Sequence, residues 1–254
     1  MNKFGSNSSC YNIVVFGGTS DIASSYLTAS LTQKSQEKFK FYLLGRNSIA
    51  LDVKKRHFQT LGADVETVRA NFSETERLKR TLDKIPRIDE AFICFSELTN
   101  QNESEIDDEY LVSQLETNFI LNVRWINDMA NRLIMQNEGK IIVLGSVAGD
   151  LGRKRNYTYG SAKAGLEVFC QGVQHKIADT GVTLAFIKPG LVNTKMTAGL
   201  ELNRALTSNV EEVGKKILMA VNSGKRVSYI PAYWRILMLV IKSIPWCFYK
   251  NMDI

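Results

Sequence analysis

Residues that build metal centres and disulfide frameworks are scarce in this sequence. The 254 residues include only four cysteines and two histidines, and no two cysteines form a C-x-x-C pair. A zinc site and a disulfide-stabilised scaffold both need such residues in clusters, so the sequence argues against either. We expect a reduced, cytoplasmic setting and a reaction that uses no metal ion.

Long apolar stretches are scarce as well. Residues 1–10 are polar and rich in serine and asparagine, and they lack the apolar core of an export signal. We therefore expect a short flexible lead-in, then one domain over residues 11–232 and an extension over residues 233–254 that packs on the domain. The net charge of +6 is modest and does not indicate a nucleic-acid partner.

Apolar segments of strand length alternate with amphipathic segments along most of the chain. They predict strands at residues 11–16, 39–44, 65–70, 91–95, 140–144, 182–187 and 226–230. Continuous apolar strands are typical of a parallel sheet that is buried on both faces. Residues 107–135 predict one long helix, and residues 100–108 predict an acidic loop before it.

The turn after the first strand predicts a phosphate site. It reads Gly17-Gly18-Thr19-Ser20-Asp21-Ile22 and leads directly into a helix. Free backbone N–H groups and the helix dipole both favour an anion at such a helix amino end. Asp21 is able to cap the helix, and we expect its carboxylate to face away from a bound pyrophosphate.

A second pattern combines a hydroxyl, a phenol and an amine. Tyr159 and Lys163 are spaced so that a helix presents them on one face. A nearby ammonium favours tyrosinate and lowers the pKa of a phenol from its usual value of about 10. Ser146 follows the predicted strand 140–144, and its hydroxyl can join the other two groups at the carboxyl edge of that strand. The three side chains predict a proton-transfer site at one carbonyl oxygen.

Together with Asn118, these motifs resemble the short-chain dehydrogenase/reductase family, and the resemblance covers nearly the whole chain. It implies an α/β fold, with a Rossmann-like doubly wound parallel sheet of about seven strands in a three-layer α/β/α arrangement. It also implies an NAD(P)-dependent oxidoreductase in which Tyr159 protonates the forming alkoxide and Ser146 hydrogen-bonds the same oxygen. Lys163 would lower the tyrosine pKa and bind the nicotinamide ribose, while Asn118 would open its helix and hold a water in the proton path.

The same resemblance implies a set of cofactor contacts. The cofactor-binding residues are expected to be Gly17, Thr19, Ser20, Asp21, Ile22, Arg46, Asn71, Phe72, Tyr159, Lys163, Pro189, Val192 and Thr194. Two departures weaken the match: Asp21 and Ala23 replace two family glycines, and Ile93-Cys94-Phe95-Ser96 stands where the family has N-N-A-G. Residues 195–206 correspond to the family's mobile flap over the substrate.

Arg46 predicts the choice between the two nicotinamide cofactors. It follows the second predicted strand, where NAD-binding proteins usually carry an acid for the ribose 2′-hydroxyl. A guanidinium fits a 2′-phosphate bidentately, so we expect NADP(H) to be preferred over NAD(H).

Arg153, Lys154 and Arg155 form a basic run between Ser146 and Tyr159. Such a run is either a solvated loop or a contact for a phosphate or diphosphate on the substrate, and the sequence leaves both interpretations open.

The C-terminal segment is apolar, aromatic and basic. An unbroken apolar run over residues 236–241 lies between Arg235 and Lys242, and Pro231 and Pro245 interrupt the longer segment. The segment is too interrupted for a membrane span of about 20 apolar residues. It suits either an interfacial helix that touches lipid or a helix buried in a subunit interface.

The catalytic block and the C-terminal third resemble the decaprenylphosphoryl-2-keto-ribose reductase branch of the family. That resemblance implies reduction of a polyprenyl-phosphate-linked 2-keto sugar for cell-envelope polysaccharide biosynthesis, at the inner face of the cell membrane. It also implies a flavoprotein oxidase as partner and a homodimer or homotetramer. A soluble ketoreductase for small or nucleotide-linked ketones and a non-catalytic cofactor-binding scaffold are the alternatives.

Overall fold

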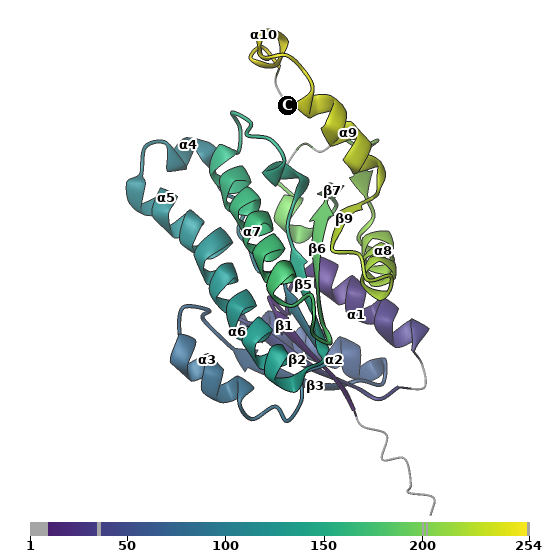
Figure 1. The fold of residues 1–254 in the computed structure, drawn as a ribbon. Helices are drawn as coiled ribbons and strands as arrows, with labels where there is room; N and C mark the ends of the chain where they lie inside the picture. Colours follow the sequence, from purple (N-terminus) through teal and green to yellow (C-terminus); the bar gives the residue numbers. More distant parts are fainter. Residues whose placement is uncertain (1–9, 35–36, 200, 202, 253–254) are drawn as a thin grey trace, which may run out of the picture.

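A computed structural model describes residues 10–34, 37–199, 201 and 203–252. Parallel strands form one sheet in the centre of the molecule (Figure 1). In spatial order they are β3 (Asp64–Arg69), β2 (Phe39–Gly45), β1 (Tyr11–Phe16), β4 (Glu90–Ile93), β5 (Gly139–Leu144), β6 (Val182–Pro189) and β9 (Val227–Ile230). The strand order runs outwards from β1 in one direction and from β4 in the other, so the sheet is doubly wound. This arrangement confirms the predicted fold.

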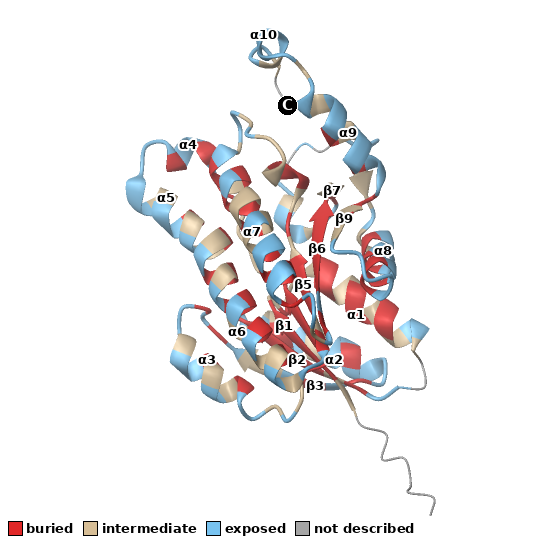
Figure 2. Ribbon diagram, viewed as in Figure 1, coloured by how far each residue is buried: buried red, intermediate tan, exposed pale blue. Residues whose placement is uncertain are grey.

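Helices cover both faces of the sheet and complete the three layers. One face carries α1 (Asp21–Gln33), α2 (Ser48–Thr60) and α8 (Val210–Asn222), and the other carries α3 (Thr75–Leu82), α6 (Leu121–Gln136) and α7 (Tyr157–Lys176). Strand β1 separates the two cores, because Ile13 and Val15 point into the first and Val14 and Phe16 into the second. All four side chains are fully buried, and Figure 2 shows the central strands mostly in the colour of buried residues.

Three helical segments differ from the sequence-based expectation. Helix α2 was not predicted, because Leu51 and Phe58 are its only buried residues and make a weak apolar period. The predicted helix 107–135 is divided into α5 (Asp108–Leu115), the π-helix η1 (Glu116–Ile120) and α6. The predicted acidic loop contains the short helix α4 (Gln101–Ser104).

Short elements and the C-terminal helices gather beyond the carboxyl ends of the strands (Figure 1). They are η2 (Val147–Gly149), β7 (Leu191–Val192), η3 (Lys195–Thr197), β8 (Thr207–Ser208), α9 (Tyr233–Lys242) and α10 (Trp246–Tyr249). None of the helices in the described part of the chain is long and apolar enough to cross a membrane. The predicted lead-in falls almost entirely on residues 1–9, and two residues of the predicted flap are 200 and 202; these lie outside the described residues.

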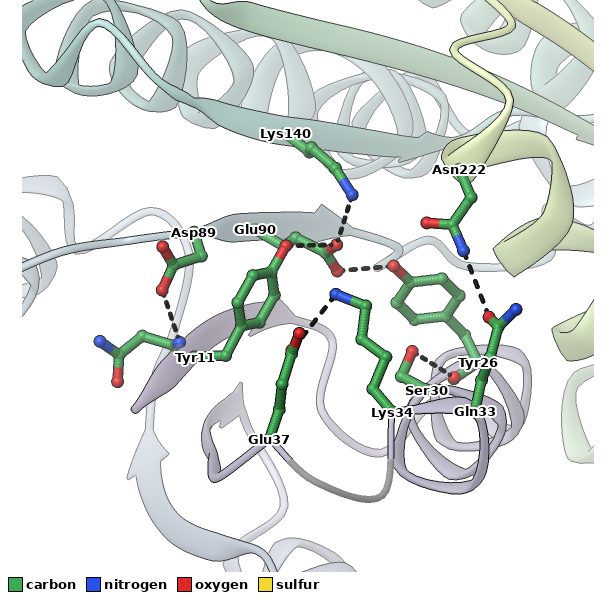
Figure 3. Close-up of polar contacts among 11 residues, drawn as sticks. Tyr11, Tyr26, Ser30, Gln33, Lys34, Glu37, Asp89, Glu90, Lys140 and Asn222 are labelled. Atoms are coloured by element: carbon green, nitrogen blue, oxygen red, sulfur yellow. Dashed lines mark hydrogen bonds and ion pairs between the residues drawn. The ribbon is translucent and has the colours of Figure 1, made fainter. Parts of the chain in front are cut away.

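A buried carboxylate organises the opposite, amino edge of the sheet (Figure 3). Glu90 accepts hydrogen bonds from the hydroxyls of Tyr11 (2.9 Å) and Tyr26 (2.5 Å), and Lys140 Nζ lies 3.4 Å from its carboxylate. Burying an unpaired carboxylate is costly, and these partners offset the cost. The cluster joins α1 to three central strands, so it stabilises the sheet away from the edge where the loops converge.

Candidate active site

Ser146 and Tyr159 meet at the carboxyl edge of β5. Ser146 immediately precedes η2 and caps it, because its Oγ accepts a hydrogen bond from the Ala148 N–H at 3.0 Å. The hydroxyl of Tyr159, near the start of α7, lies near the side chains of Ser146 and Ser96, and both of them act to lower its pKa. The fold therefore brings together a serine and a tyrosine that a loop separates in the sequence.

Two glycines allow this meeting, because they let α7 pack directly on η2. A Cβ atom at Gly160 would lie 2.8 Å from the Ala148 carbonyl oxygen, and one at Gly149 would lie 2.8 Å from the Ala164 nitrogen. Carbon atoms do not approach backbone oxygen and nitrogen that closely, so any larger residue would push the two elements apart.

The environment of Tyr159 corrects the prediction of a low phenol pKa. Burial raises the pKa of Tyr159 to about 12, although the nearby Ser96 and Ser146 side chains act in the opposite direction. Lys163 Nζ lies over the face of the ring, 5.5 Å from its centroid. Desolvation therefore outweighs the effect of the two serines, and Tyr159 keeps its proton at neutral pH.

Lys163 is almost fully enclosed by protein. Its side chain is 2% exposed, and its Nζ donates a hydrogen bond to the carbonyl oxygen of Leu144 at 3.2 Å. Burial lowers the pKa of Lys163 to about 8, because removal from water disfavours the ammonium. The amine is thus close to titrating under physiological conditions.

Asn118 lies in the π-helix between α5 and α6 and is fully buried. Its Oδ1 accepts a hydrogen bond from the Glu97 N–H at 2.8 Å, whereas its Nδ2 has no partner. Asn122 Nδ2 donates to the Thr117 carbonyl oxygen at 2.9 Å and so satisfies a backbone group in the widened turn. The helix is locally opened as the resemblance implied, and one buried donor is left for a ligand or water.

The turn between β1 and α1 is held tightly against the neighbouring strands. Gly17 has a φ of 102°, and a Cβ atom at Gly18 would lie 2.7 Å from Leu43 Cβ. Ser20 Oγ caps α1 by accepting from the Ala23 N–H at 3.3 Å, while Thr19 is partly exposed and Ile22 is buried. The first N–H groups of α1 have no intrahelical partner, and they lie where the strand order reverses, the usual ligand crevice of doubly wound sheets.

Asp21 is the first residue of α1 and not its cap, which corrects one expectation. Its Oδ1 lies 3.3 Å from Lys54 Nζ, and its Oδ2 accepts a hydrogen bond from the Lys195 N–H at 3.1 Å. The carboxylate that replaces a family glycine therefore joins α1 to α2 and to the segment after β7. Its charge is compensated by these two donors.

Arg46 is exposed and forms an ion pair that the sequence did not predict. Its Nη2 lies 2.5 Å from Glu97 Oε1, and Glu97 follows β4 on the opposite side of β1. Although no acid stands next to Arg46 in the sequence, the fold supplies one.

Asn71 and Phe72 follow β3 and differ strongly in exposure. Asn71 is exposed, and its Oδ1 accepts from the Ser73 N–H at 3.3 Å. Phe72 is buried and stacks on Phe95, with ring centroids 4.2 Å apart. Phe72 is thus a core residue, and its ring packs on that of Phe95, one of the residues that depart from the family pattern.

The segment after β6 carries the remaining predicted cofactor residues. Pro189 ends β6, and Val192 in β7 is buried. Thr194 immediately precedes η3, and its N–H donates to Thr197 Oγ1 at 3.1 Å, while Thr197 Oγ1 also donates to the Val192 carbonyl oxygen at 2.7 Å. Thr194 is partly exposed, and the next residue, Lys195, contacts Asp21 at the amino end of α1.

The basic run follows η2 and lies next to the C-terminal helices. Arg153 is partly buried, and burial lowers its pKa, whereas Lys154 and Arg155 are exposed. Tyr249 of α10 donates a hydrogen bond to the Gly152 carbonyl oxygen at 2.6 Å. The loop that carries the three cations is therefore held from its outer side by the C-terminal segment.

Comparison with known proteins decides the family. Residues 12–205 match the family model described as short chain dehydrogenase. The chain therefore belongs to the short-chain dehydrogenase family. An uncharacterized oxidoreductase of Mycobacterium tuberculosis is 32% identical over 162 residues, which cover 64% of this chain and 65% of that protein. The 3-oxoacyl-acyl-carrier-protein reductase of Escherichia coli is 27% identical over 157 residues, which cover 62% of this chain and 59% of that protein.

Solved structures of the family share the fold. A short chain dehydrogenase from Burkholderia cenocepacia, in complex with NADP, has a TM-score of 0.77 at 17% identity, covering 95% of this chain and 97% of its own. Because the identity is low, the likeness establishes the architecture of this short-chain dehydrogenase and not its ligand.

In this short-chain dehydrogenase, helix α9 of the C-terminal segment packs beside the candidate active site. Trp234 and Met238 of α9 are buried against Val147, the residue after Ser146. A Cβ atom at Gly190 would lie inside the Trp234 indole, so the ring occupies the space above the segment after β6. The opposite face of α9 is exposed.

The sequence did not predict the contacts of three residues near the site. Ser96 lies near the Tyr159 hydroxyl, Glu97 pairs with Arg46, and Lys188 contacts the carboxylates of Asp150 and Glu167. Ser96 was visible only as a departure from N-N-A-G. No local signal marks Glu97 or Lys188, because their partners lie far away in the sequence.

Proposed function

We propose that the chain is an NADPH-dependent ketoreductase, and that its substrate is a phosphorylated, polyprenyl-phosphate-linked keto sugar such as a 2-keto-ribose. The observation that carries the ketoreductase part is the meeting of the Ser146 and Tyr159 hydroxyls, with buried Lys163 behind the ring. The substrate part rests on the basic loop and the C-terminal segment beside this site.

The residues present fit a nicotinamide dinucleotide. The N–H groups at the amino end of α1 that Ser20 does not cap suit its pyrophosphate, and the unpaired Nδ2 of buried Asn118 offers a donor for a bound water. Arg46 would hold the 2′-phosphate, Asn71 the adenine, and Val192 and Thr194 the carboxamide. When bound, the cofactor supplies the hydride.

Each catalytic candidate has a distinct task in this proposal. Tyr159, whose pKa is raised to about 12, keeps its proton until an alkoxide forms next to it and then donates that proton. Ser146 donates a hydrogen bond to the same oxygen and stabilises its developing charge. Lys163 supplies positive charge behind the phenol, and Asn118 connects the buried amine to water.

A phenol that holds its proton favours reduction over oxidation. In the reductive direction Tyr159 acts as an acid, and the raised pKa leaves it fully protonated at neutral pH. In the oxidative direction it would have to act as a base, which the same burial disfavours.

The experiment that tests the activity measures NADPH oxidation with a panel of ketones. Tyr159→Phe removes the proton donor without a change of shape, so kcat should fall about 10²–10⁴-fold while NADPH affinity measured by fluorescence is retained. Retained activity in this variant, or no NADPH oxidation by the wild type with any ketone, contradicts the proposal.

The basic loop supports a phosphate on the substrate. Arg153, Lys154 and Arg155 follow η2 directly, and the side chain of Arg153 is partly withdrawn from water. A guanidinium in such a place binds phosphate bidentately and more strongly than on an open surface.

Neutralising the loop tests this part of the proposal. The triple variant Arg153→Gln, Lys154→Gln, Arg155→Gln should raise KM for a phosphorylated keto sugar by about tenfold or more, and leave KM for an uncharged ketone nearly unchanged. The matched control is Lys79→Gln, Arg80→Gln, Lys84→Gln on and after α3, which removes the same charge far from the site. Equal effects on both substrates argue against phosphate recognition.

The C-terminal helices support contact with a lipid surface that presents such a substrate. On α9, Ile236, Leu239 and Val240 are 68%, 67% and 58% exposed, and Trp246 and Phe248 of α10 are exposed as well. Residues 233–252 contain the cations Arg235, Lys242 and Lys250 and no acid, which suits an anionic membrane.

Flotation with phosphatidylglycerol vesicles tests the contact. Ile236→Ser, Leu239→Ser, Val240→Ser should abolish flotation, whereas Ile49→Ser, Val53→Ser on exposed positions of α2 should not. Wild-type protein that stays with the soluble fraction and dimerises through α9 would assign this face to a subunit interface instead. A keto-sugar substrate would in turn require an oxidase, and a flavoprotein is the class that the family resemblance suggests.

A soluble ketoreductase for smaller ketones is the second candidate. It is favoured by the similarity to the 3-oxoacyl-acyl-carrier-protein reductase of E. coli. Higher kcat/KM for 3-oxoacyl thioesters than for phosphorylated keto sugars would select it.

A further inference from the structure

Lys188 is a buried cation at the carboxyl end of β6 that the proposed reaction does not use. Its Nζ contacts Asp150 and lies 2.5 Å from Glu167 Oε2, and its side chain is only 3% exposed. Burial alone would lower the pKa of Lys188, but hydrogen bonds to Asp150 and Glu167 raise it. The ammonium is therefore retained although the side chain is almost fully buried.

The two carboxylates belong to the two elements that carry the catalytic candidates. Asp150 directly follows η2, at whose start Ser146 lies, and its Oδ2 accepts a hydrogen bond from the Tyr229 hydroxyl at 2.9 Å. Glu167 lies on α7, and its spacing from Tyr159 and Lys163 puts all three on one helix face.

Lys188 itself belongs to the third segment of the site. It precedes Pro189, which leads into β7 and on to Thr194. In the sheet Lys188 pairs with Tyr229 of β9, whose ring centroid lies 5.0 Å from its Nζ. One ammonium thus contacts a carboxylate from each of two active-site elements and is itself part of the third.

We propose that Lys188 is a positioning residue that fixes the positions of residues 145–150, helix α7 and the segment 189–194 relative to one another. It acts through Asp150 on the end of η2 and through Glu167 on α7, and it touches neither substrate nor cofactor. Reaction rates depend steeply on such alignment, since a displacement of about 1 Å can lower a rate about 100-fold.

Lys188→Met tests the proposal, because it keeps the length of the side chain and removes its charge. Amide hydrogen exchange should accelerate in residues 145–150, in the first turns of α7 and in residues 189–194, and less elsewhere. With the ketone panel, kcat should fall about 100-fold. The affinity for NADPH should change far less, because the adenine half of the proposed site lies on β1, β2 and β3.

The matched control is Lys140→Met. Lys140 pairs with buried Glu90 on the neighbouring strand but lies at the amino edge of the sheet. Its loss should accelerate exchange around β1, β4 and β5 at that edge and leave kcat nearly unchanged. Tyr229→Phe removes only the hydrogen bond to Asp150 and serves if Lys188→Met does not fold; it should give the same exchange pattern more weakly.

The inference is overturned if Lys188→Met, or Tyr229→Phe in its place, shows wild-type exchange in the three segments, or uniform acceleration over the whole sheet. The kcat readout rests on the proposed function, but the exchange readout does not. If the wild type reduces no ketone, the proposed function fails while the exchange pattern still decides the role of Lys188.

Discussion

At the scale of single residues, the candidate active site combines a phenol that holds its proton with an amine that is ready to lose one. The pKa of Tyr159 is raised to about 12 and that of Lys163 is lowered to about 8, both by burial. Because burial favours the neutral form of each group, the same environment shifts an acid and a base in opposite directions.

This pair predicts how activity depends on pH. As pH rises through about 8, Lys163 loses its proton before Tyr159 does, so the positive charge behind the phenol disappears. Reductive kcat/KM should therefore be level below this pH and fall above it, with an apparent pKa near 8 that belongs to the free enzyme. The Lys163→Arg variant keeps a positive charge at this position above pH 8, so its kcat/KM should not decline there, although its activity is lower than that of the wild type. If the decline near pH 8 persists in this variant, another group causes it.

Arg46 and Glu97 predict the cofactor preference at the same scale. Arg46→Ala should raise KM for NADPH about tenfold or more, because a charge-assisted contact to the 2′-phosphate is lost, and should leave KM for NADH unchanged. Glu97→Gln frees Arg46 from an exposed ion pair and should lower KM for NADPH by about two- to fivefold. Comparable efficiency with NADH in the wild type would contradict the assignment.

At the scale of elements, the contact between η2 and α7 determines whether Ser146 reaches Tyr159. Neither element carries the site alone, and their approach depends on glycine at positions 149 and 160. The π-helix at Asn118 is a comparable device, because Asn122 satisfies the backbone group that the widened turn leaves unpaired.

Gly160→Ala should therefore separate the two hydroxyls. The added carbon would meet the Ala148 carbonyl oxygen at 2.8 Å, so stability should fall by about 1–3 kcal/mol and kcat by about 100-fold. Gly172→Ala on the same helix meets no atom within 4 Å and should be neutral or stabilising by up to about 1 kcal/mol. Urea unfolding and NADPH oxidation measure the two effects, and equal activity in both variants would exclude the steric argument.

At the scale of the whole molecule, the two edges of the sheet have different tasks. The carboxyl edge gathers the catalytic candidates, whereas the amino edge is closed by the polar cluster around Glu90 (Figure 3). Loops of a doubly wound sheet can therefore vary at one edge while the other holds α1 and the central strands together.

The amino-edge cluster predicts a loss of stability in alkali. Burial and the neighbouring Glu90 raise the pKa of Tyr26 well above 10, so the folded state keeps a proton that the unfolded chain loses above about pH 10. The free energy of unfolding should therefore fall as pH rises above 10.

Tyr26→Phe isolates this contribution. At pH 7 the substitution should lower the free energy of unfolding by about 1.5–3 kcal/mol, because a hydrogen bond to a charged group is lost. Above pH 10 the free energy of unfolding of the variant should decline less steeply than that of the wild type. Urea unfolding at several pH values measures both, with Tyr233→Phe in the exposed C-terminal helix as control. If the free energy of unfolding of Tyr26→Phe declines above pH 10 as steeply as that of the wild type, the Glu90 cluster is not the cause of the decline.

The sequence alone was enough for the fold and for the list of catalytic candidates. Apolar strands and the turn after β1 follow from local patterns, because side-chain periodicity and glycine positions are read along the chain. The family motifs around Ser146, Tyr159 and Lys163 are likewise contiguous, so no knowledge of long-range contacts was needed to find them.

Only the tertiary structure decided what surrounds those candidates. The raised pKa of Tyr159, the ion pair between Arg46 and Glu97 and the contacts of Lys188 depend on residues that lie far apart in the chain. Desolvation and ion pairing act through space, and local sequence patterns carry no information on which distant carboxylate or hydroxyl the fold brings within reach.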